Sequence, residues 1–268
     1  MDEKWENLII LDACRYDSFE ENVLRTGFNG RLELRQSRGT DTRTFLEQNF
    51  SHGSHPEIVY VTANPVVSRF LRGRVGQIVP VWKLAWDEQN NTVMPGPVCD
   101  YALEARRRFP KHRLIIHFMQ PHYPFVGYKL EASTFKGRPR PLTCYAPTWS
   151  KWEQFMVYSD PSDTKALYNQ NLAFVMNYVQ DLATELTGLT VITADHGESF
   201  GDRLSPLFPI RVYEHPPRVA IRSLITVPWF IVGPQVRTQS LGHPVSYTVD
   251  EVDDEELIKQ RLKLLGYE

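Results

Sequence analysis

The sequence predicts an α/β protein built as a three-layer sandwich, with helices on both faces of a largely parallel central sheet. Four short apolar runs, at residues 7–11, 57–61, 113–118 and 189–193, have the length of buried strands. Segments of helical periodicity alternate with these runs along the chain. Strands that alternate with helices typically form parallel sheets whose faces the helices cover.

Two helices are expected in the first part of the chain. The segment 17–26 follows the first strand, and the segment 42–50 follows the polar loop 37–42. A weaker strand is expected at 77–82, because its apolar run is interrupted by a proline.

Three longer helices are expected in the rest of the chain. The segment 97–109 has a proline near its start and ends in arginines before another proline, and 163–186 carries apolar residues at helical spacing. The segment 250–265 opens with acidic residues, which suit a helix N-terminus. The apolar run 227–232 contains Pro228, which indicates an edge strand or the start of a strand.

We expect one domain over residues 1–268, because the chain shows neither an internal repeat nor a low-complexity linker. Residues 127–160 are rich in proline, basic and aromatic residues without a clear period. Long irregular segments in compact domains are usually functional loops, so this one is expected to be an insertion or lid.

Composition narrows the class of protein. The formal net charge of −2 argues against a general nucleic-acid binder. The three cysteines, Cys14, Cys99 and Cys144, are odd in number and widely spaced, as in reduced proteins. The N-terminus is acidic, and no apolar run is long enough to cross a membrane. These features predict a cytoplasmic protein without a transmembrane segment, and leave its oligomeric state open.

Polar residues gather where the predicted strands end. Asp12 follows the first strand, Asp195 and His196 follow the strand at 189–193, and His122 lies in the loop after the strand at 113–118. The loop 37–42 leads into a helix N-terminus. Because ligands bind outside the carboxyl ends of strands in such sheets, we expect these residues at one site.

Asp195 and His196 form a natural pair for a divalent cation, since a carboxylate oxygen and an imidazole suit Zn²⁺ or Mn²⁺, with Mg²⁺ or Ca²⁺ as alternatives. Alone, the pair equally fits a turn cap and a core histidine. Asp12 strengthens the metal hypothesis, because two close buried carboxylates are costly without a cation. Asp12 taken alone also fits an N-cap of the next helix.

Thr42 places an alcohol at a helix N-terminus, where an anion is stabilised. A threonine hydroxyl is a poor nucleophile unless a metal or a base activates it. The simpler alternative is that Thr42 only caps the helix. Ser199 offers a second nucleophile, because GESFG matches the G-x-S-x-G elbow of serine esterases. The elbow requires a helix directly after the serine, whereas Pro206 and Pro209 follow here.

Five motifs in this order resemble the alkaline phosphatase superfamily. They are LIILDACRYD, SRGTDT, MQPHYPF, TADHGESFGD and VPWFIV, and the similarity extends roughly over residues 8–232. It is strongest to the sulfatase-like branch, which includes sulfatases, phosphoethanolamine transferases and lipoteichoic acid synthases. The resemblance implies an alkaline-phosphatase-like fold and a metal-dependent hydrolase or transferase.

The resemblance also implies roles for individual residues. Asp12 matches the first metal-binding acid, and Asp195 with His196 matches the second acid and the metal histidine. The GTDT loop is similar to the nucleophile loop of the phosphoethanolamine transferases, which points to Thr42 as nucleophile and metal ligand, with Thr40 as the alternative.

Two histidines and two arginines complete the expected site. His122 matches a histidine that contacts the transferred or leaving group, and His215 matches a late histidine that serves a second metal or the substrate. Arg15 and Arg38 flank the expected site and are candidates to bind a phosphate, although solvated surface positions explain them equally well. The stretch 117–120 lacks the acid that two-metal members carry, so the sequence predicts one ion and leaves a second open.

The chain has no C/S-x-P-S-R motif, which sulfatases need, so a phosphoester substrate is favoured over a sulfate ester. Such a substrate is expected to be a small molecule or to be linked to a glycan or lipid. A catalytically inactive protein that binds a phosphorylated glycan or partner is the alternative. We expect Asn64 in a turn and His117 in the core, and leave Glu198 and Asp202 unassigned. The tail helix is expected to be structural or oligomeric.

Overall fold

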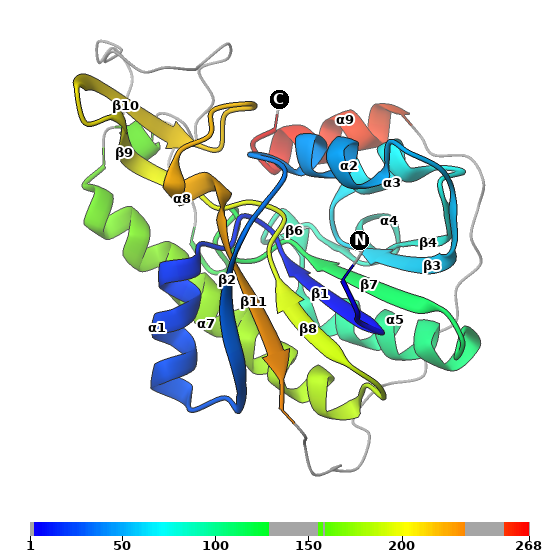
Figure 1. Cartoon of the computed structure of the whole chain (residues 1–268). Coiled ribbons are helices and arrows are strands. Elements are labelled where there is room, and N and C mark those ends of the chain that lie inside the picture. The colour runs from blue at the N-terminus through cyan, green and yellow to red at the C-terminus, as the bar shows by residue number, and fades with distance from the viewer. Residues whose placement is uncertain (1–2, 129–154, 158, 234–254, 268) are drawn as a thin grey trace.

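The computed structural model describes residues 3–128, 155–157, 159–233 and 255–267 (Figure 1). Its centre is a seven-stranded sheet in the order β2-β11-β8-β1-β7-β3-β4, in which β11 alone runs antiparallel to the others. The strands are β1 (Asn7–Leu11), β2 (Gly30–Gln36), β3 (His55–Thr62), β4 (Val75–Pro80), β7 (Arg113–Phe118), β8 (Thr190–Thr193) and β11 (Thr226–Val232).

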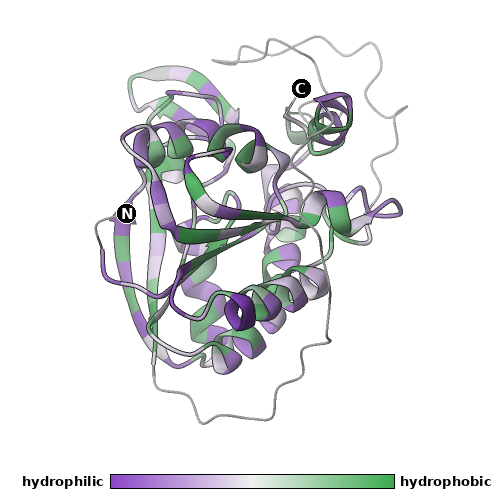
Figure 2. Cartoon of the chain, turned by 90° about the vertical axis from the view of Figure 1, so that its right-hand side faces the viewer, coloured by the Kyte–Doolittle hydropathy of each residue, from purple (hydrophilic) through white to green (hydrophobic). Residues whose placement is uncertain are grey.

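Helices cover both faces of this sheet, as predicted. The alternation of side chains along β1 shows the two layers, because Ile9 and Leu11 pack on one face while Leu8 and Ile10 pack on the other. The first face is covered by α1, α5 and α7, and the second by α2 and α3. In Figure 2 the strands between the helix layers carry long apolar stretches. The helices are α1 (Tyr16–Thr26), α2 (Thr42–Phe50), α3 (Pro65–Leu71), α5 (Pro95–Arg108) and α7 (Pro161–Glu185).

Smaller elements lie around the carboxyl edge of the sheet. A hairpin of β9 (Ser199–Ser205) and β10 (Phe208–Glu214) projects from it, and α9 (Glu255–Leu264) packs beside α3 (Figure 1). The remaining elements are α4 (Val81–Leu84), β5 (Trp86–Asp87), β6 (Thr92–Val93) and α8 (Arg222–Ile225). None of the described helices combines the length and apolarity that crossing a membrane requires.

The predicted α/β class and its mostly parallel sheet are confirmed. The strands at 7–11 and 113–118 and the helix at 42–50 have the expected bounds. The sequence did not reveal β2, because none of its residues is buried and charged residues alternate along it. The hairpin was also missed, since its strands carry a proline, a glycine and two arginines that mask any alternation.

The expectation for Pro228 is only partly correct. The strand β11 is not an edge strand, because it lies between β2 and β8. Its pairing with β8 begins one residue later, at Trp229, so a missing N–H at Pro228 removes no ladder hydrogen bond to β8. Of the expected lid at 127–160, residues 129–154 and 158 lie outside the described part, as do residues 250–254 of the tail helix.

Candidate active site

Four side chains from three segments of the chain meet at the carboxyl edge of the sheet. Asp12 follows β1, Asp195 and His196 follow β8, and Thr42 is the first residue of α2. All four are fully buried. The Thr42 hydroxyl donates a hydrogen bond to Asp195 Oδ2 at 2.7 Å and lies 3.5 Å from His196 Nε2. We call these four residues the first group.

The backbone after β1 is shaped to hold the two carboxylates together. Ala13 adopts a left-handed conformation with φ 58°, which for a residue with a Cβ costs about 1–3 kcal/mol. In that conformation its N–H donates to Asp195 Oδ1 at 3.1 Å, and its carbonyl accepts from the Tyr168 hydroxyl at 2.7 Å. These hydrogen bonds offset the strain and fix Asp195 beside Asp12.

The start of α2 fixes the position of Thr42. Asp41 forms a capping box with Thr44, whose N–H donates to Asp41 Oδ1 at 3.0 Å. The loop before the helix packs so closely that a Cβ on Gly39 would lie 2.2 Å from the backbone nitrogen of Phe45. Thr42 therefore presents its hydroxyl from a rigid helix N-terminus, where the helix dipole favours negative charge.

Thr40, the alternative nucleophile, has a different role. Its hydroxyl donates to the Pro216 carbonyl at 3.1 Å and accepts from the Arg218 N–H at 2.7 Å. It therefore ties the loop after β10 to the loop before α2. Of the two threonines, Thr42 is the one whose hydroxyl contacts the buried carboxylates.

Two side chains near the first group have roles that the sequence did not reveal. Asn64 caps α3 through its Oδ1, in keeping with the expected turn, and its Nδ2 donates to Asp12 Oδ2 at 2.7 Å. Asn64 Nδ2 also donates to the hydroxyl of Tyr267 at 3.0 Å. Tyr267 follows α9, so the tail helix brings a side chain to the first group.

His117 differs from the satisfied core histidine that we expected. Its Nδ1 is hydrogen-bonded to the Tyr60 hydroxyl at 3.0 Å, whereas its Nε2 has no hydrogen-bond partner among the described residues. The Nε2 atom faces the carboxylates, at 3.4 Å from Asp12 Oδ2 and 3.8 Å from Asp195 Oδ2. A buried Nε2 that faces two carboxylates in this way is a candidate donor to a cation held between them.

The spacing of the donor atoms in the first group fits a divalent cation. His196 Nε2 lies 3.4 Å from Asp195 Oδ2 and 3.7 Å from Asp12 Oδ1. Ligand atoms about 2.0–2.2 Å from a tetrahedral zinc ion lie roughly 3.3–3.6 Å from one another. Burial raises the pKa of Asp12, but nearby histidines, His117 foremost, lower this pKa by more than burial raises it. The pKa of Asp12 therefore lies well below its usual range. Asp12 is thus ionised at neutral pH, as a metal ligand must be.

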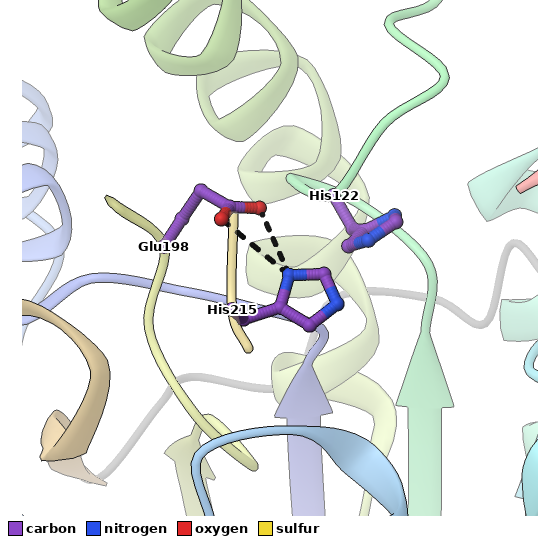
Figure 3. A group of neighbouring side chains, drawn as sticks. All are labelled: His122, Glu198 and His215. Carbon is purple, nitrogen blue, oxygen red and sulfur yellow. Dashed lines mark hydrogen bonds and ion pairs between the residues drawn. The ribbon is translucent and has the colours of Figure 1, made fainter. Parts of the chain in front are cut away.

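His122, Glu198 and His215 form a second group (Figure 3). They come from the loop after β7, the segment before β9 and the end of β10. His215 Nδ1 lies 3.3 Å from Glu198 Oε2 and 3.4 Å from Oε1, and the rings of His122 and His215 are 5.0 Å apart. One donor atom from each residue lies within 4.8 Å of the others, which suits a second cation. Glu198 thus places a carboxylate beside His122, whereas the stretch 117–120 contains none.

Protonation differs among the members of this second group. Burial lowers the pKa of His215, but the Glu198 carboxylate raises it more, to about 9. Burial raises the pKa of Glu198, but His215 and the other histidines bring it below its ordinary value. Burial is the main cause of the lowered pKa of His122. At neutral pH and without a metal, Glu198 and His215 therefore form an ion pair beside a neutral His122.

Arg15 does not point at the site as a free phosphate clamp. Its guanidinium donates to both oxygens of Asp17, to Asp202 Oδ2 at 3.1 Å, and to the Glu198 carbonyl at 2.8 Å. Arg15 thus holds the segment that carries Glu198. Arg38 is exposed and takes no part in the site contacts given above.

Ser199 lies at the start of β9 instead of between a strand and a helix. Its hydroxyl oxygen lies 2.8 Å from the Val212 carbonyl oxygen and 3.0 Å from Asp202 Oδ2, and it donates its one proton to either acceptor. The nucleophile-elbow geometry is therefore absent at this serine, and its hydroxyl pins the hairpin instead.

A cavity of about 770 Å³ opens beside the two groups. His215 and Tyr267 lie on its inner wall, and α2, α3 and the loop after β10 form its sides. Three arginines and three acidic residues line it together with apolar residues, so the cavity suits a substrate with both polar and apolar parts. The charged residues are Arg43, Arg69, Arg218, Asp41, Glu47 and Glu214.

Comparison with known proteins shows the fold. No protein-family model and no curated protein matches the chain. Among solved structures, the Zn complex of the C-terminal periplasmic domain of EcEptC from Escherichia coli superposes with a TM-score of 0.51 at 12% identity, covering 84% of this chain and 71% of that one. A putative sulfatase from Bacteroides thetaiotaomicron superposes with a TM-score of 0.55 at 14% identity. The 2-O GAG sulfatase BT1596 superposes with a TM-score of 0.53 at 14% identity. Each of these two matches covers 98% of this chain and 71% of the matched chain.

These likenesses confirm the predicted sulfatase-like, alkaline-phosphatase-like fold. They also correct the expectation of a cytoplasmic protein, because the EcEptC domain is periplasmic. The expectation relied on cysteine usage and on the absence of an apolar leader. Cys14, which is buried, and Cys99, which is partly exposed, are free in the structure, and two free thiols do not exclude an oxidising compartment.

Proposed function

We propose that this chain is a metal-dependent hydrolase or transferase of the sulfatase-like type that acts on a phosphoester through Thr42. The observation that carries the proposal is the hydrogen bond from Thr42 Oγ1 to Asp195 Oδ2 at 2.7 Å, within a buried set of two carboxylates and a histidine. The zinc-bound EcEptC domain and the sulfatases that share the fold support this reading.

Asp12, Asp195, His196 and Thr42 would hold one ion, with Zn²⁺ or Mn²⁺ favoured by the mixed oxygen and nitrogen donors. A bound divalent ion lowers the pKa of an alcohol and neutralises charge on the transferred group. The unpaired Nε2 of His117 is available as a further donor. A second ion at His122, Glu198 and His215 is compatible with their spacing.

The chain's own residues account for the proton and charge movements. Thr42 Oγ1 attacks phosphorus as its proton passes to Asp195 Oδ2, and the bond from phosphorus to the leaving oxygen breaks. When no ion occupies the second group, protonated His215 can donate its proton to that oxygen, because its pKa lies near 9. Water or an acceptor alcohol then attacks the phospho-threonine and restores Thr42.

A phosphoester remains favoured over a sulfate ester, because Thr42 stands where sulfatases need an oxidisable cysteine or serine motif. The substrate is proposed to be a small molecule or the headgroup of a glycan- or lipid-linked ester. The arginines of the cavity would contact its anionic remainder. We place all parts of the site in the single domain expected over residues 1–268.

A panel of chromogenic phosphomonoesters, phosphodiesters and sulfate esters tests this proposal with the metal-loaded protein. Thr42→Ala should abolish turnover and phospho-threonine formation, measured by peptide mass spectrometry, while most of the metal is retained. Thr42→Ser keeps the hydroxyl and should keep measurable activity, and Thr40→Ala is the matched control. Turnover by Thr42→Ala at the unaltered rate would contradict the nucleophile assignment. Metal binding without any turnover would favour a binding protein instead.

A further inference from the structure

The end of α9 directs a tyrosine into the candidate active site. Gly266 adopts a left-handed conformation with φ 88°, its N–H donates to the Lys263 carbonyl, and the Tyr267 N–H donates to the Leu262 carbonyl at 3.0 Å. These two bonds form a Schellman motif, which ends the helix and turns the following residue away from the helix axis. The side chain of Tyr267 therefore points away from α9.

The Tyr267 hydroxyl lies among the residues of the first group. It is 3.2 Å from Thr42 Oγ1, 3.2 Å from Asp12 Oδ2, and 3.0 Å from Asn64 Nδ2. Its ring is stacked on the ring of His122, with centroids 5.1 Å apart and planes 4° from parallel. The phenol thus fills the space between the Thr42 hydroxyl and the second group.

This position conflicts with substrate binding. Thr42 has no exposed surface, and a phosphorus atom must come within about 3–3.5 Å of its hydroxyl oxygen to be attacked. The Tyr267 hydroxyl already occupies a place at that distance. The other polar neighbours of Thr42 Oγ1 are Asp195, His196 and Asn64, which are fixed by strand ends and a helix cap.

Tyr267 also borders the space into which it could move. It lines the cavity of about 770 Å³ together with His215 and Gly266, and its side chain is only partly buried. Buried Ile258 and Leu262 anchor α9, and buried Leu265 anchors the chain directly after it. Displacement of the Tyr267 side chain therefore does not require α9 itself to move.

We propose that Tyr267 occludes the candidate active site and occupies the place of the transferred phosphoryl group, so that substrate enters only after the phenol swings into the cavity. This inference rests on the proposed function for the identity of the displaced ligand. The occlusion of Thr42 and His122 itself is independent of any reaction. The apparent affinity equals the intrinsic affinity multiplied by the fraction of molecules that are open. An occluding side chain therefore weakens the binding of phosphate as well as the binding of substrate.

Kinetics and phosphate binding test the proposal with metal-loaded protein. Tyr267→Ala should raise kcat/KM for a small chromogenic phosphoester by about 10-fold, and should tighten the calorimetric Kd of inorganic phosphate by a similar factor. Tyr267→Phe, which keeps the ring and loses the hydroxyl bonds, should show a smaller gain. Tyr101→Ala, on α5, is the matched control and should change neither value. A fall in kcat with unchanged phosphate affinity in Tyr267→Ala would overturn occlusion, because Tyr267 would then act in the reaction.

A second measurement separates occlusion from the proposed function. Diethyl pyrocarbonate labelling of His122 in metal-free protein, followed by peptide mass spectrometry, should be about 10-fold faster in Tyr267→Ala than in the unaltered chain. Gly266→Ala strains the left-handed cap, so it should also speed labelling if Tyr267→Ala does not fold. Faster labelling without turnover in any variant would support occlusion and reject the phosphoesterase. Unchanged labelling in a folded variant would reject occlusion.

Discussion

The two groups of the candidate site are built on different parts of the molecule. The first group stands on the ends of β1 and β8 and the start of α2, where the backbone belongs to the central sheet or a capped helix. The second group stands on loops and on a hairpin that is not part of that sheet. Glu214 and Arg218, which flank His215, both have positive φ.

Because the two groups stand on different backbone elements, we expect them to have different roles. The proposed nucleophile and its proposed proton acceptor must keep one geometry, and a sheet edge provides it. Side chains that meet the leaving group of varied substrates can stand on hairpins and loops, because loops tolerate change better than strands do. Substitutions in the two groups should therefore separate the binding of the first metal from the rate of turnover.

The largest effect is expected in the first group. Asp195→Asn removes both a metal ligand and the acceptor of the Thr42 hydroxyl proton, so activity should fall by about 10³-fold or more. Metal content of the first group, measured by mass spectrometry of the dialysed protein, should fall with it. Full metal content together with a rate near that of the unaltered chain would show that Asp195 is neither a metal ligand nor the proton acceptor.

A smaller effect is expected in the second group. Glu198→Gln keeps the shape of the side chain but removes the negative charge that faces His215. Partners that orient catalytic groups or ligands typically contribute about 10–100-fold, so kcat should fall by that amount. The ion bound by the first group should remain. Loss of that ion in Glu198→Gln would show that the two groups bind metal as one unit.

The charge pair in the second group also predicts how stability depends on pH. The pKa of His215 is about 9 in the folded protein, against 6.5 for the ordinary side chain, so its contribution is complete below pH 6.5 and is lost as the pH rises through 9. The pKa of Glu198 is lowered, so its contribution is lost only as the pH falls below the ordinary value of 4.5.

Metal-free protein should therefore unfold at a lower temperature at pH 9.5 than at pH 6.5. The fall should be several degrees, because one pKa unit corresponds to about 1.4 kcal/mol, and 1 kcal/mol shifts Tm by about 2–4 °C in a domain of this size. Calorimetry on chelated protein would measure it. In Glu198→Gln the same pH change should have a smaller effect, and an equal fall in both proteins would assign it to other groups.

The sequence was most informative where a polar residue directly follows a buried strand. Asp12, Asp195 and His196 meet that condition, and parallel strands bring such positions to one edge. His117 was missed because it stands one residue before the end of β7, where an apolar run favours a core interpretation. Its unpaired Nε2 becomes visible only once the neighbouring strands are in place.

Sequence patterns of this kind did not place Glu198 or Tyr267 at the site. The segment that carries Glu198 leads into a hairpin without clear alternation, so nothing in the sequence placed it opposite His215. The sequence predicts a helix that ends at 265, and α9 is observed to end at Leu264. Where the next side chain goes depends on how α9 docks against α3, which is a tertiary contact that local sequence does not encode.

The smallest effect is expected from the link between the two regions. Arg15 follows β1, and its guanidinium holds the Glu198 carbonyl and Asp202 at the base of the hairpin. Arg15→Lys keeps the charge but cannot keep the forked set of hydrogen bonds to both Asp17 oxygens as well. Activity should fall by only about 2–10-fold, and the first metal should stay bound, because Arg15 positions Glu198 without touching the nucleophile. If Arg15 instead contacts the substrate phosphate, KM should rise strongly while kcat is kept, and steady-state kinetics would distinguish these outcomes.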